Sequence, residues 1–114
     1  MEFEIKEQHT NGRTLIVIQG RLDAVTASTL KSTLKRLVAD EHIDLIVDLS
    51  GVSFIDSSGL SALVSGLKAT REVGGRLVLS GLNEQTRTAF RLTMLDRVFE
   101  VSPNGIDGNR PPVA

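Results

Sequence analysis

Two apolar segments with an amphipathic stretch between them constrain the fold of this chain more than any other feature. Residues 14–18 and 43–49 are rich in β-branched side chains and predict strands. Between them, residues 24–40 place leucines at helical spacing and predict an amphipathic helix, which Asp23 or Thr26 can cap. A strand, a helix and a second strand in this order form a right-handed parallel crossover. The sequence therefore predicts a sheet that contains parallel strands.

The N-terminal segment adds an antiparallel strand to that unit. Residues 3–7 alternate apolar and charged side chains, which is typical of a strand with one face in water. The Asn-Gly pair at 11–12 favours a tight hairpin turn into the next strand. The predicted sheet is therefore mixed.

In the second half of the chain, helices and strands continue to alternate. Residues 50–56 are predicted to form a loop, followed by a helix that ends at Gly74-Gly75. Residues 76–80 predict a buried strand and residues 97–101 a short final one. Between these strands we expect a third helix, which Asn83 caps and whose buried side carries Ala89, Phe90 and either Leu92 or Met94.

These elements fit one α/β domain, with a mixed sheet of four or five strands and three or four helices. The chain has 114 residues, which is the size of one domain. We expect the domain to occupy residues 1–102. Residues 103–114 contain Pro, Gly and Asn with little apolar content and are expected to form a flexible tail.

Composition excludes several classes of protein. The net charge of −1 leaves no basic surplus to neutralise nucleic-acid phosphates. The chain has no Cys, and therefore no disulfide and no thiolate ligand or nucleophile. Neither an apolar run long enough for a membrane span nor a secretory signal is visible, so we expect a cytoplasmic protein.

Polar residues converge at one predicted edge of the sheet. Ligands and partners of α/β sheets meet the carboxyl ends of parallel strands. Asp23 follows one such strand, Asp48 ends the next, and the loop to Asp56-Ser57-Ser58-Gly59 continues from there. We therefore expect these residues to share one rim.

The segment Asp56-Ser57-Ser58-Gly59 has two compatible interpretations. Asp or Ser before a helix caps its free N–H groups, a structural role typically worth about 1 kcal/mol. Two hydroxyls at a helix N-terminus also lie where the helix dipole favours an anion, so a phosphoserine could be accommodated there. Phosphorylation would add about −1.5 to −2 charge beside Asp56 and change the surface that a partner meets.

Catalytic interpretations lack partner residues. A serine hydrolase needs a base, and the two histidines, His9 and His42, lie outside the rim and are expected to be solvated. A nucleophile elbow, a phosphate-binding glycine loop and a metal-ligand cluster are all absent from the pattern. We expect no enzyme activity, no metal and no cofactor; no residue demands a nucleotide at the rim.

One enzyme-like alternative stays open. Asp23, Asp48 and Asp56 could converge as a Mg²⁺ cluster, with Asp48 accepting a phosphoryl group as in a receiver domain. Receiver domains carry an acidic pair after their first parallel strand. Here Asp23 has only Leu22 beside it.

Three segments resemble the STAS domain, and within it the bacterial anti-sigma factor antagonists. Residues 46–60 are similar to that family's phosphorylation loop, D-S-[ST]-G-[LI] after an apolar strand. Residues 20–27 resemble its G-x-L-D-x-x-T-A segment, and residues 68–77 its K-x-x-R-x-x-G-G-x-L segment. Order and spacing agree over nearly the whole predicted domain.

The resemblance implies a regulatory switch. Ser58 would be the phosphoacceptor and Ser57 its neighbour and a cap, while Asp23 and Asp56 form an acidic setting and Gly59 completes the partner-binding segment. An anti-sigma factor with serine kinase activity would bind the unmodified chain, release its sigma factor, and phosphorylate Ser58 with ATP. A PP2C-type phosphatase would reverse the modification. The free protein is expected to be a monomer.

Other members of the same family define the alternative. STAS domains also occur in stressosome and lipid-transport complexes. If this chain is a scaffold subunit of such a complex, Asp56-Ser57-Ser58 is only a cap and a binding surface, and no phosphorylation occurs. Arg21 stands where many members have an acidic residue and could change partner selectivity or compensate charge at the rim. Met94 replaces a common glycine, where it could fill a groove or pack in the core, and Asn83-Glu84 replaces a common Ser-Pro.

Overall fold

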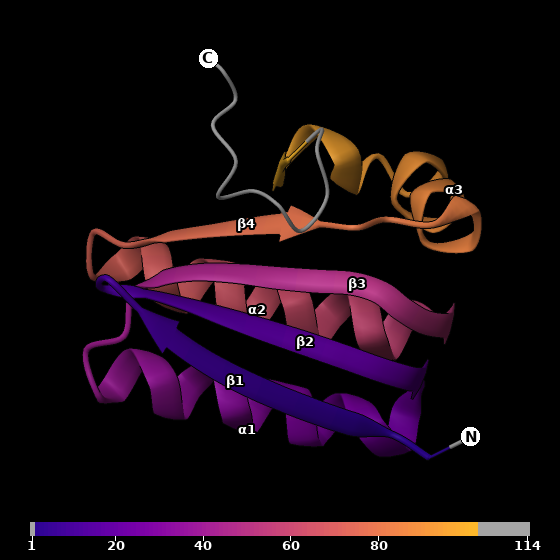
Figure 1. The fold of residues 1–114 in the computed structure, drawn as a ribbon. Coiled ribbons are helices and arrows are strands. Elements are labelled where there is room, and N and C mark those ends of the chain that lie inside the picture. Colours follow the sequence, from indigo (N-terminus) through magenta and orange to yellow (C-terminus); the bar gives the residue numbers. More distant parts are fainter. Residues whose placement is uncertain (1, 103–114) are drawn as a thin grey trace.

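The computed structural model describes residues 2–102, which form a five-stranded sheet with three α-helices (Figure 1). The strands lie in the order β1-β2-β3-β4-β5; β1 is antiparallel to β2, and every other pair is parallel. Their bounds are β1 Glu4–Thr10, β2 Arg13–Leu22, β3 Asp44–Ile55, β4 Arg76–Ser80 and β5 Glu100–Val101. The helices are α1 Ala24–Ala39, α2 Ser57–Glu72 and α3 Glu84–Leu92, with a 3-10 turn η1 at Leu95–Arg97. The predicted α/β class and mixed sheet are confirmed, whereas the predicted tail 103–114 lies outside the described residues.

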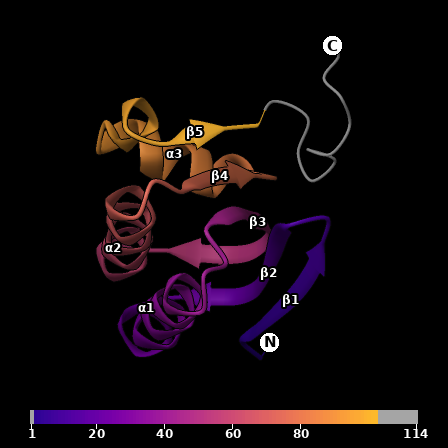
Figure 2. The same cartoon turned by 90° about the vertical axis from the view of Figure 1, so that its left-hand side faces the viewer.

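The core lies between the sheet and the helices α1 and α2, which cover the same face (Figure 2). Alternate residues of the central strands, such as Ile16, Ile18 and Val47, are fully buried there. The two helices approach closely, because a Cβ added at Gly66 of α2 would lie 3.2 Å from the Cβ of Leu34 on α1. No helix within residues 2–102 is long and apolar enough to cross a membrane.

Residues 50–56 do not form the predicted loop. Strand β3 continues to Ile55, because β2 also continues, to Leu22, and supplies its backbone partners as far as the pair Leu22↔Ile55. Two register shifts interrupt this pairing, so the buried residues Val52 and Ile55 are three positions apart instead of two. The broken alternation hides the strand in the sequence.

The predicted packing of the C-terminal part is also wrong in part. Leu92 and Met94 are 77% and 59% exposed, and the ring of Phe90 packs edge-on against Phe99 at 5.5 Å between centroids instead. Of the predicted strand 97–101, only Glu100–Val101 pairs with β4, because the turn η1 occupies the preceding residues. Met94 is therefore not part of the core, and it lies after the end of the third helix.

Met94 has a left-handed backbone, with φ of 63° and ψ of 14°. A residue with a Cβ is strained in this region, typically by about 1–2 kcal/mol, whereas glycine is not. The glycine that is common at this position in the family thus has a physical reason.

Met94→Gly is predicted to raise the free energy of unfolding by about 0.5–1 kcal/mol, since relief of strain exceeds the extra chain entropy of glycine. Urea denaturation measures the change. Met94→Ala is the control: it removes the same exposed side chain and keeps the Cβ, so its stability should stay near wild type. Equal stability of the Gly and Ala variants would contradict the strain.

Candidate functional site

The carboxyl ends of β2 and β3 lie side by side and each continues directly into a helix. The last paired residues are Leu22 and Ile55, and the backbone N–H of Asp56 donates to the carbonyl of Leu22 at 3.3 Å. Asp23 and Asp56 come next in the two strands and cap α1 and α2. We call this pair of helix starts, with Ser57, Ser58 and Gly59, the rim.

Asp23 forms a capping box with Thr26. Its carboxylate accepts the backbone N–H groups of Val25 at 3.1 Å and Thr26 at 3.2 Å, and the Thr26 hydroxyl accepts the N–H of Asp23 at 3.0 Å. The backbone N–H of Thr26, assisted by that of Val25 and by the charge of Arg21, holds the pKa of Asp23 below its ordinary value. The prediction that Asp23 caps this helix is confirmed, and its carboxylate is ionised at neutral pH.

Asp56 caps α2. Its Oδ1 accepts the backbone N–H of Ser58 at 2.9 Å and that of Gly59 at 3.3 Å. Neither serine hydroxyl forms a hydrogen bond within residues 2–102, where Ser57 is exposed and Ser58 is half-buried. Ser57 is therefore not a cap, contrary to our prediction, because it is the first residue of α2 and Asp56 occupies the capping position before it.

Gly59 lies where the start of α2 touches the end of β2. A Cβ at this position would be 2.7 Å from the carbonyl oxygen of Leu22 and 2.8 Å from Cγ1 of Ile55. Real Cβ atoms do not approach backbone oxygens so closely, so a larger residue would push the helix away from the sheet. Glycine at this position therefore allows the start of α2, with Ser58, to pack directly against the end of β2.

Arg21 gives the rim a cation of fixed position. Its guanidinium carbon lies 4.2 Å from the ring centroid of Phe54, on the neighbouring strand, and its Nε lies 3.7 Å from Oδ2 of Asp23. Stacking on an aromatic ring limits the freedom of an exposed arginine. Arg21 thus offsets part of the negative charge of Asp23, in line with one of the two interpretations of this residue.

Asp48 does not join the rim. It lies inside β3, paired with Val17 and Ser80, at eight residues and roughly 25 Å of strand from Asp56. Its side chain is 4% exposed and accepts the backbone N–H of Ser50 at 2.9 Å. The expectation that Asp23, Asp48 and Asp56 converge is wrong, because β3 continues past Asp48; within residues 2–102 no group of three such ligands could hold a metal.

Two other polar features lie away from the rim. The rings of His9 and His42 meet at 4.5 Å between centroids, near the amino ends of the parallel strands, and the Nδ1 of His9 lies 3.0 Å from the Thr14 hydroxyl. Only His9 is exposed, and His42 is half-buried, so the predicted solvation holds for one of them. The pair belongs to the end of the sheet opposite the rim.

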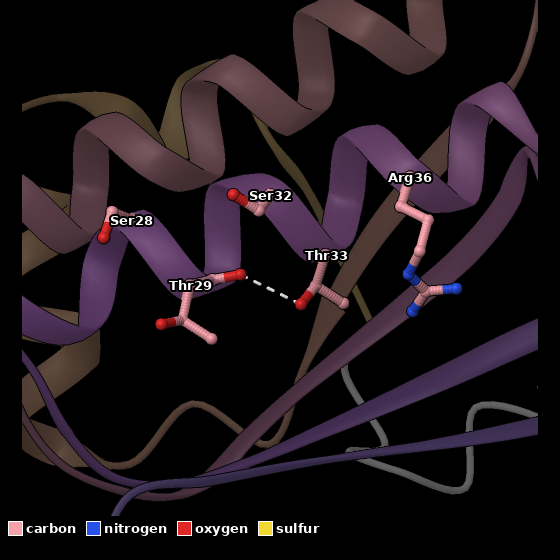
Figure 3. A pocket seen from close by; sticks show the side chains of 5 residues that line it. All are labelled: Ser28, Thr29, Ser32, Thr33 and Arg36. Atoms are coloured by element: carbon pink, nitrogen blue, oxygen red, sulfur yellow. Dashed lines mark hydrogen bonds between the residues drawn. The ribbon is translucent and has the colours of Figure 1, made fainter.

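A shallow surface hollow follows α1 and is lined by hydroxyls and one arginine, namely Ser28, Thr29, Ser32, Thr33 and Arg36 (Figure 3). The Thr33 hydroxyl donates to the Thr29 carbonyl at 2.9 Å, drawn as the dashed line, and Arg36 pairs with Glu7. The Ser28 and Thr33 hydroxyls are engaged with their own helix and Arg36 with β1, whereas the Thr29 and Ser32 hydroxyls form no hydrogen bond within residues 2–102. Two exposed hydroxyls on one helix do not indicate a ligand site.

Two amide side chains at the start of α3 touch the backbone just before the rim, and these contacts were not indicated by the sequence patterns. Gln85 accepts the N–H of Ile55 through its Oε1 at 3.1 Å, and its Nε2 faces the Ile55 carbonyl at 3.5 Å. The side-chain amide of Asn83 donates to the carbonyl of Val52 at 2.7 Å. These contacts join residues about 30 positions apart, so no local pattern could reveal them.

Comparison with known proteins shows the family to which this chain belongs. The STAS domain family model matches residues 3–105. An anti-sigma-B factor antagonist of Listeria monocytogenes is 36% identical over 101 residues, covering 89% of this chain and 88% of the relative. An anti-sigma-F factor antagonist of Mycobacterium tuberculosis is 35% identical over 94 residues, covering 80% and 74%.

A solved structure agrees with the sequence relatives. The crystal structure of an anti-sigma factor antagonist from Mycobacterium paratuberculosis has a TM-score of 0.76 at 30% identity, covering 95% of this chain and 92% of that one. The resemblance inferred from the three sequence segments is thereby confirmed. This chain belongs to the STAS domain family, and the relatives described above are named anti-sigma factor antagonists.

Proposed function

We propose that this protein is a cytoplasmic, non-enzymatic anti-sigma factor antagonist that is switched at Ser58. In its unmodified form it binds an anti-sigma factor with serine kinase activity and so releases the sigma factor. That kinase transfers the γ-phosphoryl group of ATP to the Ser58 oxygen, ADP leaves, and a PP2C-type phosphatase restores the hydroxyl by hydrolysis. The names of the relatives support the antagonist role.

The observation that carries the switch is the hydroxyl of Ser58, which has no hydrogen bond within residues 2–102 and lies at a helix start already capped by another residue. Because Asp56 holds the N–H groups of Ser58 and Gly59, the serine hydroxyls are not needed to stabilise α2. A structural cap thus explains Asp56 and leaves the two serines unexplained. This favours a role for them in modification over the alternative of a STAS scaffold that is never phosphorylated.

Charge explains how modification would change binding while the fold persists. A phosphate on Ser58 adds about −1.5 to −2 charge close to Asp56 and Asp23. The positive end of the α2 dipole tolerates that charge, so the helix keeps its start. A partner surface that docks on the rim would instead face a strongly negative patch, and its binding would weaken.

Labelling in an extract of the source cells tests the acceptor. With ATP carrying a labelled γ-phosphate, the wild type is expected to gain one phosphoryl group, mapped to Ser58 by mass spectrometry and removed by a PP2C-type phosphatase. Ser58→Ala should abolish labelling, and Ser57→Ala, the matched control one residue away, should keep it. Labelling that persists in Ser58→Ala would show that another residue is the phosphoacceptor. A wild type that is not labelled would favour the alternative of a STAS scaffold that is never phosphorylated.

Ser58→Asp should separate binding from folding. The melting temperature is expected to stay within about 3 °C of wild type, because a negative charge suits a helix start. Affinity for the kinase purified from the source cells should fall at least tenfold, or about 1.4 kcal/mol, in calorimetric titration. Ser57→Asp, on the neighbouring exposed residue, serves as control. An unchanged affinity of Ser58→Asp would contradict the charge mechanism.

Two substitutions at Asp23 should distinguish a partner contact from a cap. Asparagine caps helices about as well as aspartate and lacks its charge, so Asp23→Asn keeps α1 and alters the rim. We expect several-fold slower association with the purified kinase, with the largest effect at low salt. Asp40→Asn, at the exposed far end of α1, is the charge-matched control. A loss of binding in Asp23→Ala alone would assign Asp23 a structural role only.

A further inference from the structure

The outer edge of β3 loses its strand partner before the rim. Strand β4 pairs with β3 only as far as Asp48↔Ser80, whereas β3 runs on to Ile55. On its other side, β3 stays paired with β2, whose Leu22 carbonyl accepts the N–H of Asp56. The backbone groups that point away from β2 therefore need other partners, since Val52 and Ile55 are buried to 1% and 3% exposure.

Side-chain amides at the start of α3 take the place of the missing strand. A side-chain carboxamide offers a carbonyl acceptor and an NH2 donor, the same two kinds of hydrogen-bonding group that the backbone of a strand carries. The amide of Gln85 faces both backbone groups of Ile55, and that of Asn83 bonds the carbonyl of Val52. Asn83 also caps α3 through the N–H of Thr86 at 3.0 Å, so the helix start and the strand edge are held as one unit.

The contact of Gln85 lies one residue before the cap of α2. Ile55 is followed directly by Asp56, whose carboxylate holds the N–H groups of Ser58 and Gly59. Fixing the peptide groups on both sides of Ile55 therefore limits the backbone rotations that would displace Asp56 and the Ser58 hydroxyl. From the side of β2, the carbonyl of Leu22 accepts the N–H of Asp56 in the same turn.

We propose that Gln85 is a positioning residue for phosphorylation: its carboxamide holds the backbone of Ile55 and thereby fixes the orientation in which Ser58 is presented to the kinase. This inference rests on the proposed function. It gives α3, which carries no part of the phosphorylation segment, a defined role in it.

Three variants separate hydrogen bonding from packing at this position. Gln85→Ala removes the side chain, and Gln85→Leu keeps similar bulk without any hydrogen bond. Gln85→Glu keeps an acceptor for the Ile55 N–H and loses the donor. Gln8→Ala is the matched control, because Gln8 is an exposed glutamine on β1 with no side-chain hydrogen bond within residues 2–102.

Amide hydrogen exchange followed by NMR reads the positioning without any kinase. Gln85→Ala and Gln85→Leu are expected to speed exchange at Ile55, Ser58 and Gly59 at least tenfold, with Leu45 and Leu79 in the core unchanged. Gln85→Glu should give an intermediate rate at Ile55. The Gln8→Ala control should match wild type throughout. Unchanged exchange at Ser58 and Gly59 in Gln85→Ala would overturn the inference.

The initial rate of Ser58 labelling in source-cell extract measures how well each variant presents Ser58 to the kinase. It should fall at least fivefold in Gln85→Ala and Gln85→Leu, recover in part in Gln85→Glu, and stay at the wild-type value in Gln8→Ala. If the wild type is labelled and the Gln85 variants are labelled equally fast, the positioning role is refuted while the proposed function stands. If the wild type is not labelled, the proposed function falls and this inference falls with it.

Discussion

The parallel pairing of β2 with β3 determines where every other functional feature of the chain lies. The pairing ends at Leu22 and Ile55, and the residue that follows each of them is an aspartate that caps a helix. The register of the two strands therefore places the two caps next to each other. A slip of one residue would turn the side chains of a strand to the opposite face and separate the two caps. The position of Ser58 thus follows from sheet register, and Gly59 is required because α2 begins directly against the end of β2.

Unequal strand lengths explain why the third helix belongs to the same site. Strand β3 has 12 residues and β4 has 5, so the last part of β3 would present an unpaired edge. The amides of Asn83 and Gln85 cover that edge from a helix that follows β4 directly in the chain. Asn83 stands where the family commonly has serine, whose shorter side chain lacks an amide to donate in this way. The departure from the family pattern is therefore coupled to how this chain completes its sheet.

Periodicity and capping rules predicted the elements whose side chains repeat regularly. The helix capped by Asp23, the strand pair around it and the helix that follows Asp56 could all be located from local patterns. The end of β3 could not, because its two bulges break the alternation of buried residues. Leu92 and Met94 misled for a different reason: their apolar side chains fit a buried stripe, whereas the left-handed backbone at Met94 has already ended the helix. The role of Gln85 depends on a contact across 30 residues and leaves no trace in neighbouring positions.

The arrangement of the caps also determines whether a phosphate on Ser58 would bind the N–H groups of α2 or change the charge of the surface. Anions at helix starts commonly take the free N–H groups, yet here Asp56 already occupies those of Ser58 and Gly59. A phosphate would have to displace this carboxylate, with which it shares the sign of its charge, to bind the same donors. Arg21 offers no ready substitute, since its guanidinium is held on Phe54 beside Asp23. Under the proposed function, the added charge would therefore stay at the surface of the rim, where a docking partner would meet it, and the sheet beneath would keep its structure.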